Sequence, residues 1–136
     1  MLAAHPGFAP AHEVLWSANF RLGKYEEAFS HAVRGLADPE VVEVLQEAYP
    51  ETGYAGAMRR AAEMLVARSQ QQYVSPMQVA LLFAHAGDSP QVLEWLNRAV
   101  DLHDTQIVYA PMRPDFEELW DQPGFLEVMR RINLPA

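Results

Sequence analysis

The side chains that could carry out chemistry are spread thinly along the chain. None of its histidines forms the His-x-x-x-His spacing that places two metal ligands on one helix face. A zinc site needs three or four converging ligands, and the absence of cysteine also removes disulfides and thiol catalysis. We therefore expect no metal site and no cofactor. The histidines are interpreted as solvent or helix-end residues: His5, His12, His31, His85 and His103.

Four acids fall within seven residues near the C-terminal end: Asp115, Glu117, Glu118 and Asp121. A calcium loop would require alternating acids, a central glycine and a terminal bidentate glutamate, and this order is missing. We interpret the cluster as a solvated face. The serines lack a Gly-x-Ser-x-Gly context, and the seven glycines are dispersed instead of forming a phosphate-binding loop. The sequence therefore predicts no enzyme activity.

Composition and charge narrow the class of partner. The chain has 136 residues, half of them hydrophobic, and a formal charge of −8 from 18 acids and 10 bases. A negative surface repels phosphate backbones, which disfavours nucleic acid and favours a basic partner. No apolar run approaches the ~20 residues that cross a bilayer, and the N-terminal residues lack the pattern of a secretory signal. We expect no membrane contact and a cytoplasmic location.

The elements that must position any site are helices. Apolar residues recur at helical spacing, and no alternating run predicts a strand. Glycines 23, 53 and 87 mark expected helix ends, and Asp38, Ser75 and Asp88 or Ser89 are expected N-caps. The helices are predicted at 10–22, 25–37, 40–50, 54–71, 76–86 and 90–102, then short turns near 107–110 and 116–120, and a last helix at 123–132.

These helices repeat. Gly87 follows Gly53 by 34 residues, which is the period of the tetratricopeptide repeat, a pair of antiparallel helices. The first pair carries that pattern as Leu15, Phe20, Gly23, Tyr25, Ala28 and Leu36. The third pair fits again with Val79, Ala80, Phe83, Gly87, Leu96 and Ala99. The middle pair is degenerate, with Met58 where the repeat has alanine. The chain thus resembles the tetratricopeptide family.

A narrower resemblance covers the second half. The segments 73–76, 79–88, 94–99 and 107–109, with Pro114-Asp115-Phe116 and Pro123-Gly124-Phe125, are similar to the C-terminal repeat region of some large bacterial proteins. Those proteins carry a winged-helix regulator or serine/threonine kinase domain upstream. The family has aspartate before these prolines, where this chain has Arg113 and Gln122, so the capping is altered. The resemblance implies a docking or sensing module of a bacterial regulatory or signalling protein.

The predicted architecture is one all-α domain over 1–136, a right-handed helical-hairpin solenoid of about three hairpins with a C-terminal cap of short helices. Its parts are a remnant of a preceding repeat at 1–9, hairpins at 10–37, 39–71 and 73–102, and the cap at 104–136. An array end needs a polar cap. Because we expect none at the N-terminal end, that end is predicted to pack on a missing upstream repeat or on another copy of the chain.

The resemblance also implies a binding surface, because the first helix of each pair faces the concave groove of this fold. The residues that it places there are Glu13, Ser17 and Phe20, then Glu40, Glu43 and Glu47, then Met77 and Leu81. We expect a protein or peptide partner, with the acidic residues selecting a basic one. Three alternatives stay open: an ordinary wet helix face, a small-molecule sensory domain with a pocket between repeats, and a self-association element.

Overall fold

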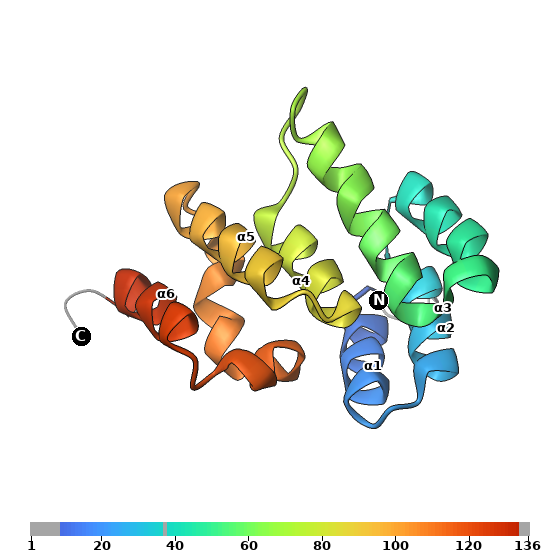
Figure 1. The fold of residues 1–136 in the computed structure, drawn as a ribbon, viewed down its shortest axis with the longest axis horizontal. Helices are drawn as coiled ribbons and strands as arrows, with labels where there is room; N and C mark the ends of the chain where they lie inside the picture. Colours follow the sequence, from blue (N-terminus) through green and yellow to red (C-terminus); the bar gives the residue numbers. More distant parts are fainter. Residues whose placement is uncertain (1–8, 37, 134–136) are drawn as a thin grey trace.

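The computed structural model describes residues 9–36 and 38–133, which form helices joined by short connections (Figure 1). The elements are α1 (Ala9–Arg21), α2 (Tyr25–Gly35), α3 (Pro39–Arg68), α4 (Pro76–Ala86), α5 (Ser89–Asp101), the 3-10 helices η2 (Thr105–Met112) and η3 (Pro114–Leu119), and α6 (Pro123–Asn133). These ranges contain no strand, so the predicted all-α class is confirmed. None of these helices is both long enough and apolar enough to span a membrane. The predicted repeat remnant at 1–9 lies outside the described residues, apart from Ala9.

Local capping sets the helix ends where the sequence predicts them. Oδ1 of Asp38 accepts hydrogen bonds from the N–H groups of the second and third residues of α3, at 3.0 and 3.3 Å. Ser75 caps α4, and Asp88, rather than Ser89, caps α5. Gly87 ends α4 with φ of 79°, a left-handed conformation that glycine adopts without a steric penalty. These caps satisfy N–H and C=O groups that a helix end leaves without intrahelical partners.

The helix α3 contains the break that the sequence predicts between two helices. Gly53 has φ of 79° and ψ of −174°, which is outside the helical region and accessible to glycine. The segments before and after Gly53 run in different directions (Figure 1). The second segment ends at Arg68, three residues before the predicted end at 71. The break places Tyr54 at the start of the second segment, where its side chain is buried.

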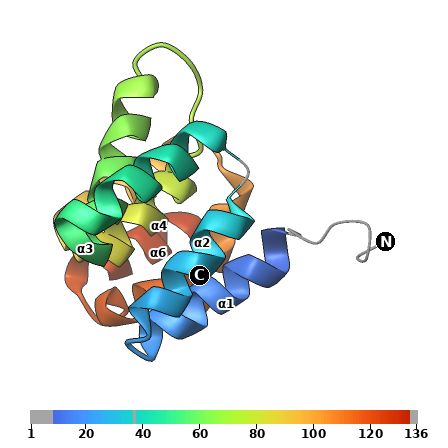
Figure 2. The same ribbon diagram turned by 90° about the vertical axis from the view of Figure 1, so that its right-hand side faces the viewer.

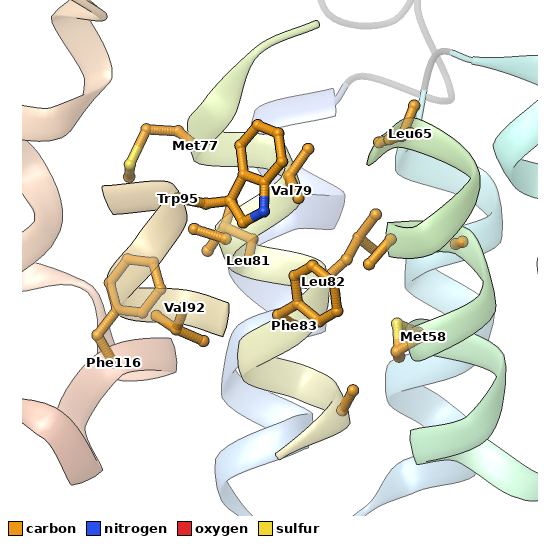
Figure 3. Packing of buried hydrophobic residues seen from close by; sticks show 14 of the residues in the cluster. Met58, Leu65, Met77, Val79, Leu81, Leu82, Phe83, Val92, Trp95 and Phe116 are labelled. Carbon is orange, nitrogen blue, oxygen red and sulfur yellow. The ribbon is translucent and has the colours of Figure 1, made fainter. Parts of the chain in front are cut away.

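Sequential helices pack against one another around α4. The helices α1 and α2 lie side by side, and α4 packs against both α3 and α5 (Figures 1 and 2). Leu82 of α4 faces Met58 and Leu65 of α3, whereas Leu81 lies on the opposite side, toward Phe116 (Figure 3). Nearly every residue of α4 is buried, as expected for a helix with neighbours on several sides.

The C-terminal segment forms the predicted short helices and returns to the N-terminal half. The 3-10 helix η3 packs against α1 and α4, and α6 packs against α5 and η2. The segment therefore covers parts of α1 and α4 that would otherwise face solvent.

Larger side chains should not fit at the buried alanines where neighbouring helices pack closely. Ala28 of α2 and Ala99 of α5 have no exposed surface, so Ala28→Leu and Ala99→Leu should each lower the free energy of unfolding by ~1–3 kcal/mol through overpacking. Urea denaturation followed by circular dichroism measures this. Ala67→Leu, at an exposed position of α3, is the control and should change stability little. Equal stability of all three variants would contradict the packing at these positions.

Candidate functional site

Buried side chains from α1, α3, α4 and η3 form one line of hydrogen bonds, which we call the polar chain. Trp16 Nε1–H donates to the Tyr54 hydroxyl at 2.8 Å, and that hydroxyl lies 2.6 Å from Nδ1 of His85. Nε2 of His85 lies 2.6 Å from Oδ2 of Asp115. The same oxygen accepts a 2.7 Å hydrogen bond from Oγ of Ser17. All five residues are buried, so the polar chain links four helices through the interior.

The donors and acceptors of the polar chain favour one protonation state of His85. Trp16 can only donate, and a carboxylate can only accept. If Tyr54 accepts from Trp16 and donates to Nδ1, His85 is the neutral tautomer with hydrogen on Nε2, which donates to Asp115. A protonated His85 would donate at both nitrogens and leave the Tyr54 hydroxyl hydrogen without this acceptor. The hydrogen-bond order therefore favours neutral imidazole and ionised carboxylate.

The pKa shifts of the buried groups favour the same protonation states. Burial lowers the pKa of His85, because a charged imidazolium loses its hydration there. Burial alone would raise the pKa of Asp115, but hydrogen bonds from His85 and Ser17 and the charge of Arg113 lower it overall. Burial also raises the pKa of Tyr54, which keeps its hydroxyl protonated. At neutral pH the polar chain thus contains one buried negative charge, on Asp115.

Two aromatic rings hold the imidazole. Trp16 and Phe20 lie one turn apart on α1, so both side chains extend from the same face. Their rings stack on His85 with centroid distances of 4.3 and 4.0 Å and interplanar angles of 30° and 27°. These contacts orient His85 between its two hydrogen-bond partners.

Asp115 differs from its acidic neighbours. Its side chain has no exposed surface, whereas Glu117 and Glu118 are exposed and form ion pairs with Arg21 of α1 at 3.4 and 3.7 Å. The interpretation of the acidic cluster as a solvated face is therefore wrong for Asp115. Arg21 and Asp115 together tie η3 to α1, one at the surface and one in the interior.

A pocket of about 420 Å³ lies between α1 and the η2–η3 segment. Its apolar wall consists of Val14, Ala18, Tyr109, Met112 and Pro114. Val14 and Met112 are about two-thirds exposed, at 67% and 66%, and Tyr109 is 49% exposed. These apolar side chains surround an opening at the surface.

The floor of the pocket is polar. Ser17, Arg113 and Asp115 line it, so the pocket ends at the polar chain. Nε of Arg113 lies 3.3 Å from Oδ1 of Asp115 and forms an ion pair with it. Within the described residues, Oδ1 accepts no hydrogen bond, whereas Oδ2 accepts two. The Asp115 side chain has no exposed surface, so its carboxylate is held beneath the pocket by Arg113, Ser17 and His85.

Four residues of the predicted groove lie inside the fold. Ser17, Met77 and Leu81 are buried, and Phe20 is half-buried against the core. For Ser17 the reason is that η3 packs on α1, whereas the ring of Phe20 lies against those of Tyr25, Tyr54 and His85. In this conformation these side chains contact the chain itself.

The glutamates of the predicted groove whose side chains the structure describes are not buried with the other groove residues. Glu40, Glu43 and Glu47 are exposed on the first segment of α3, where Glu40 forms an ion pair with Arg68. Glu13 lies on α1, and its side chain is outside the described part of the chain. A continuous groove formed by these glutamates stays a prediction.

Sequence reasoning missed the polar chain, although a signal for one member was present. His85 lies in the last turn of α4, as a helix-end histidine should, but it is only 2% exposed. The segment 76–86 has apolar residues on all sides and His85 as its single ionisable residue. A helix of that kind is buried, so its histidine needs an internal partner. Nothing local in the sequence indicated that Asp115 would be this partner.

Comparisons of the chain with protein-family models, with curated proteins and with solved structures give no match. The site must therefore be interpreted from its own geometry.

Proposed function

We propose that this chain is a protein-interaction module of the tetratricopeptide kind, a right-handed stack of about three hairpins with a C-terminal cap. In this proposal, a segment of a partner protein binds at the pocket between α1 and the η2–η3 segment. The polar chain keeps the floor of the pocket rigid. The resemblance of the sequence to repeat regions of bacterial regulators supports a docking role.

The exposed apolar rim of the pocket is the observation that carries this proposal. Val14, Tyr109 and Met112 present apolar surface to solvent around a concave opening. Exposed apolar surface that surrounds a pocket is typical of a binding site, because covering it with a partner releases ordered water. An apolar side chain of a partner that enters the pocket would gain the most from this burial.

The order of groups in the polar chain supports binding over catalysis. A nucleophilic serine is activated by a histidine that accepts its proton, and the carboxylate stands behind that histidine. Here Ser17 donates directly to Oδ2 of Asp115, and Nε2 of His85 contacts the same oxygen. The carboxylate, which is a weak base when its pKa is lowered, occupies the middle position.

The negative charge of the surface favours a partner segment that is basic. Glu43 and Glu47 are exposed on α3, and the chain has a formal charge of −8. Opposite charge on a partner would speed association, and salt would weaken the effect because it screens exposed charges.

A peptide selection tests the proposed function. Peptides selected from a displayed library on the folded chain should bind Met112→Glu about tenfold or more weakly, because a charge at the rim removes an apolar contact. Leu126→Glu is the matched control, since Leu126 is an exposed apolar residue of α6, at 54%, outside the pocket. Fluorescence anisotropy measures the dissociation constants.

Peptides that bind Met112→Glu and Leu126→Glu with equal affinity would contradict binding at this pocket. Small-molecule sensing is the second candidate, because about 420 Å³ lies within the range of ligand pockets. It would be favoured if the selection gave no pocket-dependent peptide and a small molecule stabilised the parent chain but not Met112→Glu.

A further inference from the structure

The helix α1 has apolar side chains on the side that faces away from the core. Its outer face consists of four exposed apolar residues: Val14, Leu15, Ala18 and Leu22. The three larger ones are 43% to 68% exposed. On the opposite side of the same helix, Trp16 is buried and Phe20 packs against the core. A helix with apolar residues on both sides is normally covered on both, so the outer face is a candidate interface.

The outer face is uncharged, although the chain is acidic. No charged residue occurs between Val14 and Phe20, whereas the whole chain has a formal charge of −8. Two copies of an acidic chain repel each other, so they associate most readily through a contact area that contains no acid. A basic segment, by contrast, would meet no carboxylate among the four side chains of this face. The charge distribution therefore favours a second copy over a basic segment at this face.

The spacing of the side chains is self-complementary. Val14, Ala18 and Leu22 are four residues apart, so they lie on one side of the helix. Leu22 follows the last residue of α1, but its N–H still donates to the carbonyl oxygen of Ala18 at 3.1 Å, so the helical turn continues. If two α1 helices pack antiparallel and cross at Ala18, Val14 of each copy lies opposite Leu22 of the other. A two-fold contact requires this reciprocity, and the small side chain at the crossing lets the helices approach closely.

We propose that two copies of this chain associate through the outer face of α1, in an antiparallel two-fold contact centred on Ala18. This contact goes beyond the proposed function, which concerns a partner segment in the pocket. Val14 belongs both to the outer face and to the wall of the pocket. A second copy on α1 and a partner segment in the pocket should therefore compete for it.

Sedimentation velocity over a range of protein concentrations tests the association. The parent chain should form a dimer, and its dissociation constant should fall severalfold when the ionic strength rises from about 0.05 M to about 0.5 M, because salt screens the repulsion between two acidic copies. Binding of a basic segment would weaken under the same change. Ala18→Glu should raise the dissociation constant of the dimer at least tenfold, because it places two carboxylates opposite each other at the crossing. Ala67→Glu, at an exposed alanine of α3, is the matched control and should leave it unchanged.

Single cysteines test the register of the two helices, because the chain has no cysteine of its own. Ala18→Cys should form a disulfide-linked dimer with a mild oxidant such as diamide, since the two-fold contact brings position 18 next to its own copy. Val14→Cys and Leu22→Cys should each cross-link slowly alone but should give a mixed dimer when they are combined. Ala67→Cys is again the control and should stay monomeric.

Three results would overturn the proposal. They are a parent chain that stays monomeric at every concentration, an equal dissociation constant for Ala18→Glu and Ala67→Glu, and cross-linking of Ala67→Cys as fast as that of Ala18→Cys. The proposed function is judged separately, by the binding of selected peptides to Met112→Glu and Leu126→Glu, so either proposal can fail without the other.

Discussion

Replacing Phe125 by alanine should lower the free energy of unfolding by about 3–5 kcal/mol. Phe125 is 1% exposed in α6, and its ring centroid lies 6.5 Å from that of Phe116, which is fully buried. The start of α6 is held close to α5, since a Cβ atom at Gly124 would lie 2.7 Å from Leu93.

Urea denaturation measures this effect, and the next residue provides the control. Leu126 is 54% exposed on the same helix, so Leu126→Ala should change stability by less than ~1 kcal/mol. A similar loss in both variants would contradict a buried role for Phe125 and would remove α6 from the core.

Asp115→Ala should lower the free energy of unfolding by about as much as Phe125→Ala. It removes the acceptor for His85 and Ser17 and the partner of Arg113, all at the interior end of η3. Removing one partner of a buried charged pair typically costs ~3–5 kcal/mol, because the remaining polar groups are left without compensation. Asp121→Ala, an exposed acid of the same cluster, should be close to neutral. Equal losses in these two variants would contradict the buried position of Asp115.

The effect of Asp115→Ala should depend on pH. The folded state lowers the pKa of Asp115 below its ordinary value of 3.8, so the unfolded state takes up its proton first as pH falls. The stability from ionisation of this carboxylate is therefore present above that value and lost as pH falls through the folded pKa. The difference between the parent chain and Asp115→Ala should stay constant from neutral pH down to the ordinary value of 3.8 and shrink as pH falls below it, as measured by denaturation at each pH. A difference that stayed constant below this value too would contradict ionisation of Asp115 in the folded chain.

Helix ends were predictable because their signals are local. Asp38, Ser75 and Asp88 each precede the helix that they cap, and each accepts a hydrogen bond from an N–H group two or three residues later. Gly53 and Gly87 break or end helices through their own backbone conformation. Such features depend on a few neighbouring residues, so the sequence contains all the information that they require.

The candidate site was not predictable in the same way, because its contacts are long-range. Ser17 and Asp115 are 98 residues apart, and His85 and Asp115 are 30 apart. In the sequence, Ser17 on a helix and Asp115 in an acidic cluster both resemble surface residues. Only the packing of η3 on α1 brings them together in the interior. Met77 and Leu81 were assigned to an open groove, but they are buried in α4, which has neighbours on several sides. The predicted spacing was helical and correct, but spacing does not say which segment covers a face.

The hydrogen bond between Ser17 and Asp115 also has a consequence for the order of folding. The pair α1–α2 makes contacts that are near in sequence, so it can form early, whereas η3 must close a loop of 98 residues before it reaches Ser17. Closing such a loop costs entropy before any contact compensates for it. During synthesis from the N-terminal end, Trp16 can contact Tyr54 and His85 before η3 exists, whereas Ser17 lacks its carboxylate partner until η3 has been made. The polar chain is therefore completed late, and an early intermediate need not contain a dehydrated Asp115.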